Sequence, residues 1–76
     1  MKPTTNVVKL LRTRLGLTQT AFGKSIGLST VSVCRIEKRE TGVQRDVGLR
    51  IIERYREAMQ GADISLEDLL RNKINS

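Results

Sequence analysis

Three side chains near the middle of the sequence have chemistry suited to the edges of base pairs. Thr30 supplies a hydroxyl group, Val31 supplies methyl groups and Arg35 supplies a guanidinium, all within six residues. A guanidinium can donate two hydrogen bonds to O6 and N7 of guanine, and a methyl group can contact the methyl of thymine. The three residues can act together only if one element holds them on one outward face.

The spacing of apolar residues predicts that element. Val33 and Ile36 are three residues apart, and Ser29 is a suitable N-cap for a helix that runs to about Glu37. With Val33 and Ile36 in the core, the 3.6-residue period leaves the three candidate side chains and Cys34 on the outer side. Such a face, on a basic domain, suits the major groove of DNA.

A second short helix is predicted just before this one. Thr18 can cap it, Phe22 and Ile26 share its buried face, and Gly27 ends it. The missing side chain at Gly23 lets the two helices cross closely, and Gly27 permits the sharp turn between them. This pattern predicts helix-turn-helix geometry.

The other patterns predict three more helices and an all-α class. The chain has one proline and two aromatic residues, a composition that argues against a sheet or sandwich. We expect these helices at residues 5–14, 46–60 and 65–70, with a surface loop at 38–45. Gly16 and Gly61 supply stop signals, and Ser65 and Asp68 have capping-box spacing. The prediction is a single domain over residues 1–76, a compact bundle of five short helices.

The net charge indicates a polyanionic partner. The chain has 14 Lys and Arg against 8 Asp and Glu, a formal charge of +6. Such a field favours nucleic acid or an anionic membrane surface. In the predicted helix 46–60, Glu53 and Glu57 interleave with arginines, so we expect a solvated face with opposite-charge pairs there rather than membrane contact.

The residue types needed for catalysis or metal binding are not present at useful spacings. The chain has no histidine and one cysteine, Cys34, so zinc and disulfide spacings are missing. It offers no interpretable nucleophile and base and no glycine-rich phosphate loop. We therefore expect no enzyme, metal, cofactor or small-molecule site. The longest uncharged run, residues 25–34, is too short and polar to span a membrane, which favours the cytoplasm.

The segment LTQTAFGKSIGLSTVSVCRIE, residues 17–37, resembles the helix-turn-helix of phage repressor and Cro proteins of the lambda type, the XRE family. The matching positions are Gln19, Gly23, Gly27 and Glu37. The resemblance covers residues 7–37, and ISLEDLL at 64–70 is similar to the family's final helix. It implies a lambda repressor-like fold and a transcriptional regulator that binds double-stranded operator DNA as a homodimer.

The resemblance also implies roles for individual residues. Base contacts fall to Thr30, Val31 and Arg35. Phosphate contacts fall to Thr18, Gln19, Ser29, Ser32, Lys38, Arg39 and Arg45. Arg12 and Glu37 match a structural ion pair that ties the first helix to the third. Separately, the apolar residues of the fifth helix and tail exceed what so short an end must bury, so they are the expected dimer surface: Leu66, Leu69, Leu70 and Ile74.

The chain departs from the family pattern in three places, one of which is the lack of the proline often found in the loop after the third helix. The family usually has glycine two residues after the Glu, where this chain has Arg39; a Cβ disfavours left-handed backbone, so an ending up to one turn later is an alternative. The stretch 46–64 is several residues longer than usual. The alternative function is an antitoxin-type or adaptor module that uses the fold to bind protein; an excision or replication factor is a third possibility.

Overall fold

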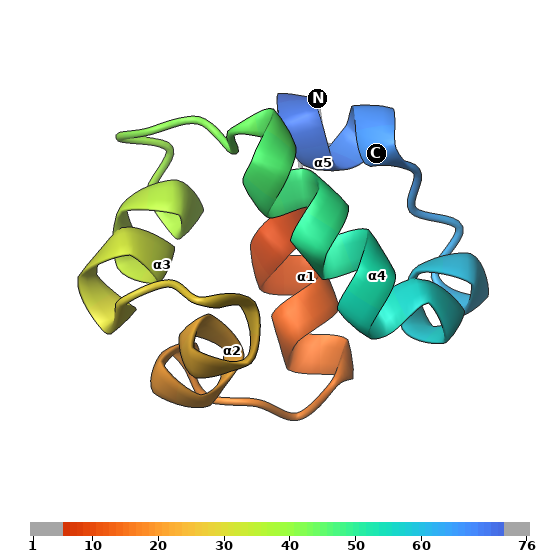
Figure 1. Ribbon diagram of the computed structural model, residues 1–76, viewed down its shortest axis with the longest axis horizontal. Coiled ribbons are helices and arrows are strands. Elements are labelled where there is room, and N and C mark those ends of the chain that lie inside the picture. The colour runs from red at the N-terminus through yellow and green to blue at the C-terminus, as the bar shows by residue number, and fades with distance from the viewer. Residues whose placement is uncertain (1–5, 73–76) are drawn as a thin grey trace, which may run out of the picture.

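The computed structural model describes residues 6–72, which form five helices and no strand. The helices are α1 (Val7–Arg14), α2 (Gln19–Ile26), α3 (Thr30–Glu37), α4 (Arg45–Gly61) and α5 (Leu66–Arg71). In Figure 1, α1 and α4 occupy the middle of the bundle, α2 and α3 lie on the left, and α5 lies at the top beside α4. The predicted all-α bundle of five helices is confirmed.

Side chains cap four of the five helix starts. The capping residues are Asn6, Thr18, Ser29 and Ser65, and each accepts a hydrogen bond from a backbone N–H in the first turn of its helix. These bonds satisfy donors that have no partner inside the helix. The predicted capping box is present in both directions, between Ser65 and Asp68. The first helix begins at Val7 rather than residue 5, because Asn6 has an extended backbone and caps it.

The core is a cluster of aliphatic side chains from every helix, with one aromatic residue, Phe22, at its centre. Its fully buried members are Val7, Val8, Leu11, Phe22, Val33, Ile51 and Leu69. Phe22 stacks on Tyr55, with 5.7 Å between ring centroids, and the Tyr55 hydroxyl hydrogen-bonds to Ser25. This aromatic pair joins α2 to α4.

Helix α4 departs from regular geometry and from its predicted end. Tyr55 has φ −125° and ψ 36°, which kinks the helix at the residue whose ring is anchored on α2. Gly61 does not break the helix but is its last residue, and the left-handed position falls on Asp63, with φ 56°. Glycine within a helical pattern therefore does not fix the exact residue at which the helix ends.

Two asparagines, one before α1 and one after α5, hydrogen-bond to backbone carbonyls at the C-terminal end of α3. Asn6 donates through Nδ2 to the carbonyls of Ile36 and Glu37, at 3.1 and 3.0 Å. Asn72 donates to the Ile36 carbonyl at 2.9 Å and accepts from the Val8 amide at 3.1 Å. Asn72 is 4% exposed and has φ 55°, a conformation that asparagine tolerates better than most residues. The pair links α1, α3 and α5.

Candidate nucleic-acid interface

A tight turn sets the angle between α2 and α3. Gly27 has φ 76°, and the Leu28 amide donates to the Gly23 carbonyl at 2.8 Å. A Cβ at Gly23 would lie 2.6 Å from the Leu28 carbonyl oxygen and 3.1 Å from Val33 Cγ2. Only glycine fits at position 23 without a shift of the turn, so this residue brings α3 close to α2.

Helix α3 has one buried face and one exposed face. Val33 and Ile36 are 0% and 6% exposed, whereas Thr30 and Arg35 are exposed and Val31 is 59% exposed. The predicted outward face is therefore present, with Cys34 half-buried beside it. The hydroxyl of Thr30 also hydrogen-bonds to Thr20 of α2, at 2.8 Å, which fixes the start of α3. Contact with bases remains a prediction.

A shallow groove brings several candidate residues together. It has a volume of about 340 Å³ and runs along the exposed face of α3; its lining residues are Gln19, Thr30, Val31, Cys34, Arg35, Lys38 and Glu40. A second groove of about 250 Å³, beside the loop after α3, is lined by Ser32 and Arg35. Arg35 thus lies between the two grooves, and the three base-reading candidates share one surface with Gln19 and Lys38.

The other predicted phosphate contacts lie outside these two grooves. The hydroxyls of Thr18 and Ser29 cap α2 and α3, and Ser29 also donates to Ser32 at 3.0 Å. Arg39 and Arg45 are exposed in and after the loop that follows α3. The two capping hydroxyls are therefore engaged within the protein, whereas the two arginines extend the basic surface beyond α3.

Beneath the exposed face of α3, an ion pair joins α1 to the end of α3, as predicted. Arg12 donates to Glu37 through Nε at 2.6 Å and through a terminal nitrogen at 2.9 Å, and it also donates to the Leu17 carbonyl at 2.9 Å. The hydrogen bonds from Arg12 to Glu37 raise the pKa of Arg12 above its usual value, against the opposing effect of burial. Glu37 also accepts from the Gln19 amide at 3.3 Å, so the same carboxylate holds the start of α2.

The structure shows where α3 ends, which the presence of Arg39 in place of glycine had left open. The helix ends at Glu37, and Arg39 itself adopts the left-handed conformation, with φ 62°. The continuation by a further turn is wrong, because Asn6 and Asn72 bind the carbonyls at this end and the Glu40 amide turns back to Arg35 O at 2.9 Å. A non-glycine residue in this conformation costs roughly 1–2 kcal/mol.

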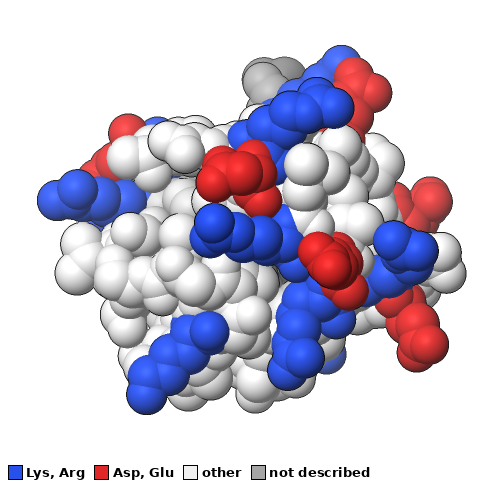
Figure 2. All heavy atoms as spheres, in the orientation of Figure 1, with Lys and Arg blue, Asp and Glu red and all other residues white. Residues whose placement is uncertain are grey.

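Positive charge is concentrated in the part of the chain that contains α2 and α3. Residues 1–45 contain nine Lys or Arg and two Asp or Glu, a charge of +7, whereas residues 46–76 contain five and six, a charge of −1. Over α4 the two signs alternate (Figure 2). The expected opposite-charge pairs among Arg50, Glu53, Arg54 and Glu57 are not formed within residues 6–72; Arg50 instead approaches Asp46 at 3.8 Å.

The predicted dimer surface needs correction. Leu69 is 0% exposed in the core of its own chain, so it has no surface to offer a partner. Leu66 and Leu70 are half-buried because they pack over Gly48, where an added Cβ would lie 3.1 and 3.3 Å from them. Ile74 lies outside the described residues. The sequence pattern did not single out Leu49, which is 47% exposed and interrupts the charged face of α4.

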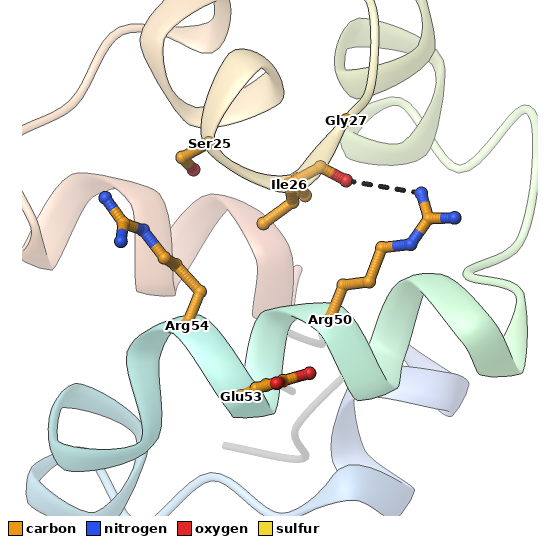
Figure 3. Close-up of a pocket in the computed structure, with 6 residues that line it drawn as sticks. All are labelled: Ser25, Ile26, Gly27, Arg50, Glu53 and Arg54. Carbon is orange, nitrogen blue, oxygen red and sulfur yellow. Dashed lines mark hydrogen bonds between the residues drawn. The ribbon is translucent and has the colours of Figure 1, made fainter.

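A cleft on another side of the bundle lies between the end of α2 and α4 (Figure 3). Arg50 and Arg54 extend from α4 on either side of it, and its volume is about 510 Å³. Arg50 donates to the Ile26 carbonyl at 3.5 Å, and its guanidinium would lie 3.2 Å from a Cβ added at Gly27. Arg50 therefore braces the turn between α2 and α3 from below.

No group of three or more His, Cys, Asp or Glu within residues 6–72 could hold a metal ion. In the same range, every helix is too short or too polar to cross a membrane. Comparison with known proteins adds no assignment: no family model, curated protein or solved structure matches the chain.

Proposed function

We propose that this protein is a sequence-specific, double-stranded DNA-binding transcriptional regulator, Cro-like or repressor-like, that lays α3 in the major groove. The observation that carries the proposal is the exposed face of α3, on which Thr30, Val31 and Arg35 lie opposite the buried Val33 and Ile36. A hydroxyl, a methyl surface and a guanidinium on one helix face match the groups that base edges present there.

The distribution of charge supports a nucleic-acid partner over a membrane. The +7 charge belongs to residues 1–45, which include α1, α2 and α3, whereas residues 46–76, which include most of α4 and all of α5, sum to −1. Neutralising phosphates releases counterions, so binding should weaken steeply as salt rises. Lys38, Arg39 and Arg45 are the exposed cations next to α3 that can contact the DNA backbone.

The rigidity of α3 also supports readout of sequence. Its start is held by Ser29 and by the Thr20–Thr30 hydrogen bond, and its end is held by Asn6, Asn72 and the Arg12–Glu37 pair. A helix fixed at both ends presents its side chains in one geometry before DNA arrives. Such preorganisation lowers the entropy lost on binding.

An α3 of eight residues can reach only a few base pairs, so we propose that two copies act together. A two-fold homodimer on a pseudopalindromic operator would place half-sites about 34 Å apart. Occupation of a promoter by such a dimer would exclude polymerase. The protein would act in the cytoplasm, without a cofactor and without an enzymatic activity.

The test is selection of bound sequences from a random DNA pool, followed by titration of selected and random duplexes at two salt concentrations. The proposal expects a recurring motif and tighter binding to the selected duplex at both salt concentrations. Arg35→Ala should reduce the preference for that motif, and Lys24→Ala, an exposed charge on α2, is the matched control for loss of one charge. A steep salt slope without sequence preference would refute specific recognition.

A second candidate function is an antitoxin-type or adaptor module that uses the bundle to bind another protein. It is favoured by the exposed Leu49 on a 17-residue α4 within the near-neutral part of the chain. This function predicts that substitutions at Leu49 matter more than those at Arg35. An excision or replication factor would share the DNA chemistry, and the genomic position of the selected motif would identify it.

A further inference from the structure

An apolar knob and an apolar groove lie next to each other on α4, on a face separate from α3. Leu49 is 47% exposed and stands one turn before the half-buried Ile52. The groove has a volume of about 350 Å³; its lining residues are Ile52, Arg56, Met59, Gln60, Ile64 and Leu66. Apart from Val31 on α3, Leu49 is the one strongly exposed large apolar side chain in residues 6–72.

Two charged side chains of opposite sign flank the knob and the groove. Glu53 and Arg56 lie on the exposed side of α4, and neither forms an ion pair within residues 6–72. Leu49, the groove beside it, Glu53 and Arg56 together form one surface patch. Each chain therefore offers one exposed apolar side chain, one apolar groove, one carboxylate and one guanidinium. A surface with both halves of every contact is self-complementary, which is the property that a two-fold interface requires.

Electrostatics restrict where two copies of this chain can meet. Each copy carries a net charge of +6, the sum of +7 in residues 1–45 and −1 in residues 46–76. A contact through α2 or α3 would bring the exposed cations Lys24, Arg35 and Lys38 close to those of the other copy. The residues from 46 onward sum to −1 and include the patch. A second copy meets the least repulsion on this side of the molecule.

We infer that two copies of this chain associate through this patch, with Leu49 of each copy in the groove of the other. Antiparallel packing of the two α4 helices about a two-fold axis near Ile52 places Leu49 opposite the stem of Arg56 of the partner subunit. In the same register, Glu53 of one copy lies within one helical turn of the guanidinium of Arg56 of the partner subunit. The two apolar contacts and the two ion pairs are related by the axis, so each occurs twice.

The location of the patch leaves both copies of α3 uncovered. In Figure 1, α3 lies at one end of the bundle. Leu49 and Ile52 belong to the first half of α4, near the middle, and the rest of the groove belongs to the second half of α4 and the segment that leads to α5, at the other end. The inference rests on the proposed function in one respect only: that the two exposed α3 helices of the dimer bind one operator. The association itself is measured without DNA.

The test is sedimentation equilibrium of the full chain from about 10 µM to about 1 mM, a range that covers weak dimers. The wild type should pass from monomer to dimer, and Leu49→Glu should lower the association constant roughly tenfold or more, because it places a charge in an apolar groove. Val31→Glu makes the same change at the other exposed apolar residue and should leave association unchanged. Circular dichroism checks that each variant keeps its helices.

Three results would overturn the inference: a monomer at every concentration, an association constant unaffected by Leu49→Glu, or equal weakening by Val31→Glu. A charge exchange tests the register. Glu53→Arg and Arg56→Glu should each weaken association, and the double variant should restore it, whereas failure of the double variant would refute the antiparallel arrangement. A dimer that binds no DNA sequence would refute DNA recognition alone, whereas a sequence-specific DNA-binding dimer whose association is unaffected by Leu49→Glu would refute this inference alone.

Discussion

Glu37 is the carboxylate that binds side chains of both α1 and α2 at the end of α3, and its removal tests how the exposed face of α3 is supported. Glu37→Ala removes two hydrogen bonds from Arg12 and one from Gln19. The side chains of the Arg12–Glu37 pair are 15% and 6% exposed, so water cannot fully solvate the guanidinium that stays behind. We expect a loss of stability with little change in the residues that face outward.

The magnitude follows from the burial of the pair. Removing one partner from a buried ion pair costs about 3–5 kcal/mol, because an uncompensated charge remains. Arg12 keeps its bond to the Leu17 carbonyl and some exposure, so we expect about 2–4 kcal/mol. A chain of 76 residues has a total stability of about 4–11 kcal/mol, so the variant should lose a large fraction of it.

Urea unfolding followed by circular dichroism measures this loss. Glu40→Ala is the matched control, because Glu40 is exposed and lies three residues further along the chain. The control should change the free energy of unfolding by less than about 0.5 kcal/mol. A double-mutant cycle with Arg12→Ala isolates the pair itself. If Glu37→Ala were no more destabilising than Glu40→Ala, the carboxylate would not hold the three helices together and the reasoning would be refuted.

Three other substitutions test the turn, the end of α3 and its outward face. Gly23→Ala should destabilise by about 1–3 kcal/mol because its Cβ would lie 2.6 Å from the Leu28 carbonyl oxygen; unchanged urea unfolding would contradict this. Arg39→Gly should stabilise by about 1 kcal/mol, since glycine adopts φ 62° without strain, and a loss of stability would show that the arginine side chain matters more. In DNA titrations, Arg35→Ala should cost about 1–3 kcal/mol at one base pair, whereas Lys38→Ala should weaken all sequences alike; equal effects on specificity would refute the assignment.

Local rules account for much of this fold. The caps at Thr18, Ser29 and Ser65 and the turn at Gly27 depend on residues only a few positions apart, so their residue types predict them. The faces of α3 follow from the 3.6-residue period in the same way. Burial of Val33 and exposure of the outward side chains could therefore be read from the sequence before any coordinates.

Contacts between distant residues were beyond the reach of such rules. Asn6 and Asn72 bind carbonyls of α3 that are 30 or more positions away, and no periodicity marks a polar residue for that role. The kink at Tyr55 has neither proline nor glycine beside it and coincides with stacking on Phe22. Leu69 has the same residue type as the exposed Leu49, so its place in the core depends on how α5 docks.

The position of Asn72 has a consequence for the order of events during synthesis. A nascent chain that has reached residue 65 already contains every side chain proposed to contact bases, yet it lacks the Asn72 amide, which adds to Asn6 a second link between the end of α3 and α1. The final helix must emerge from the ribosome before this second link can form. In a fragment without residues 66–72, only Asn6 and the Arg12–Glu37 pair would hold the end of α3, so the full set of bonds there depends on completion of α5.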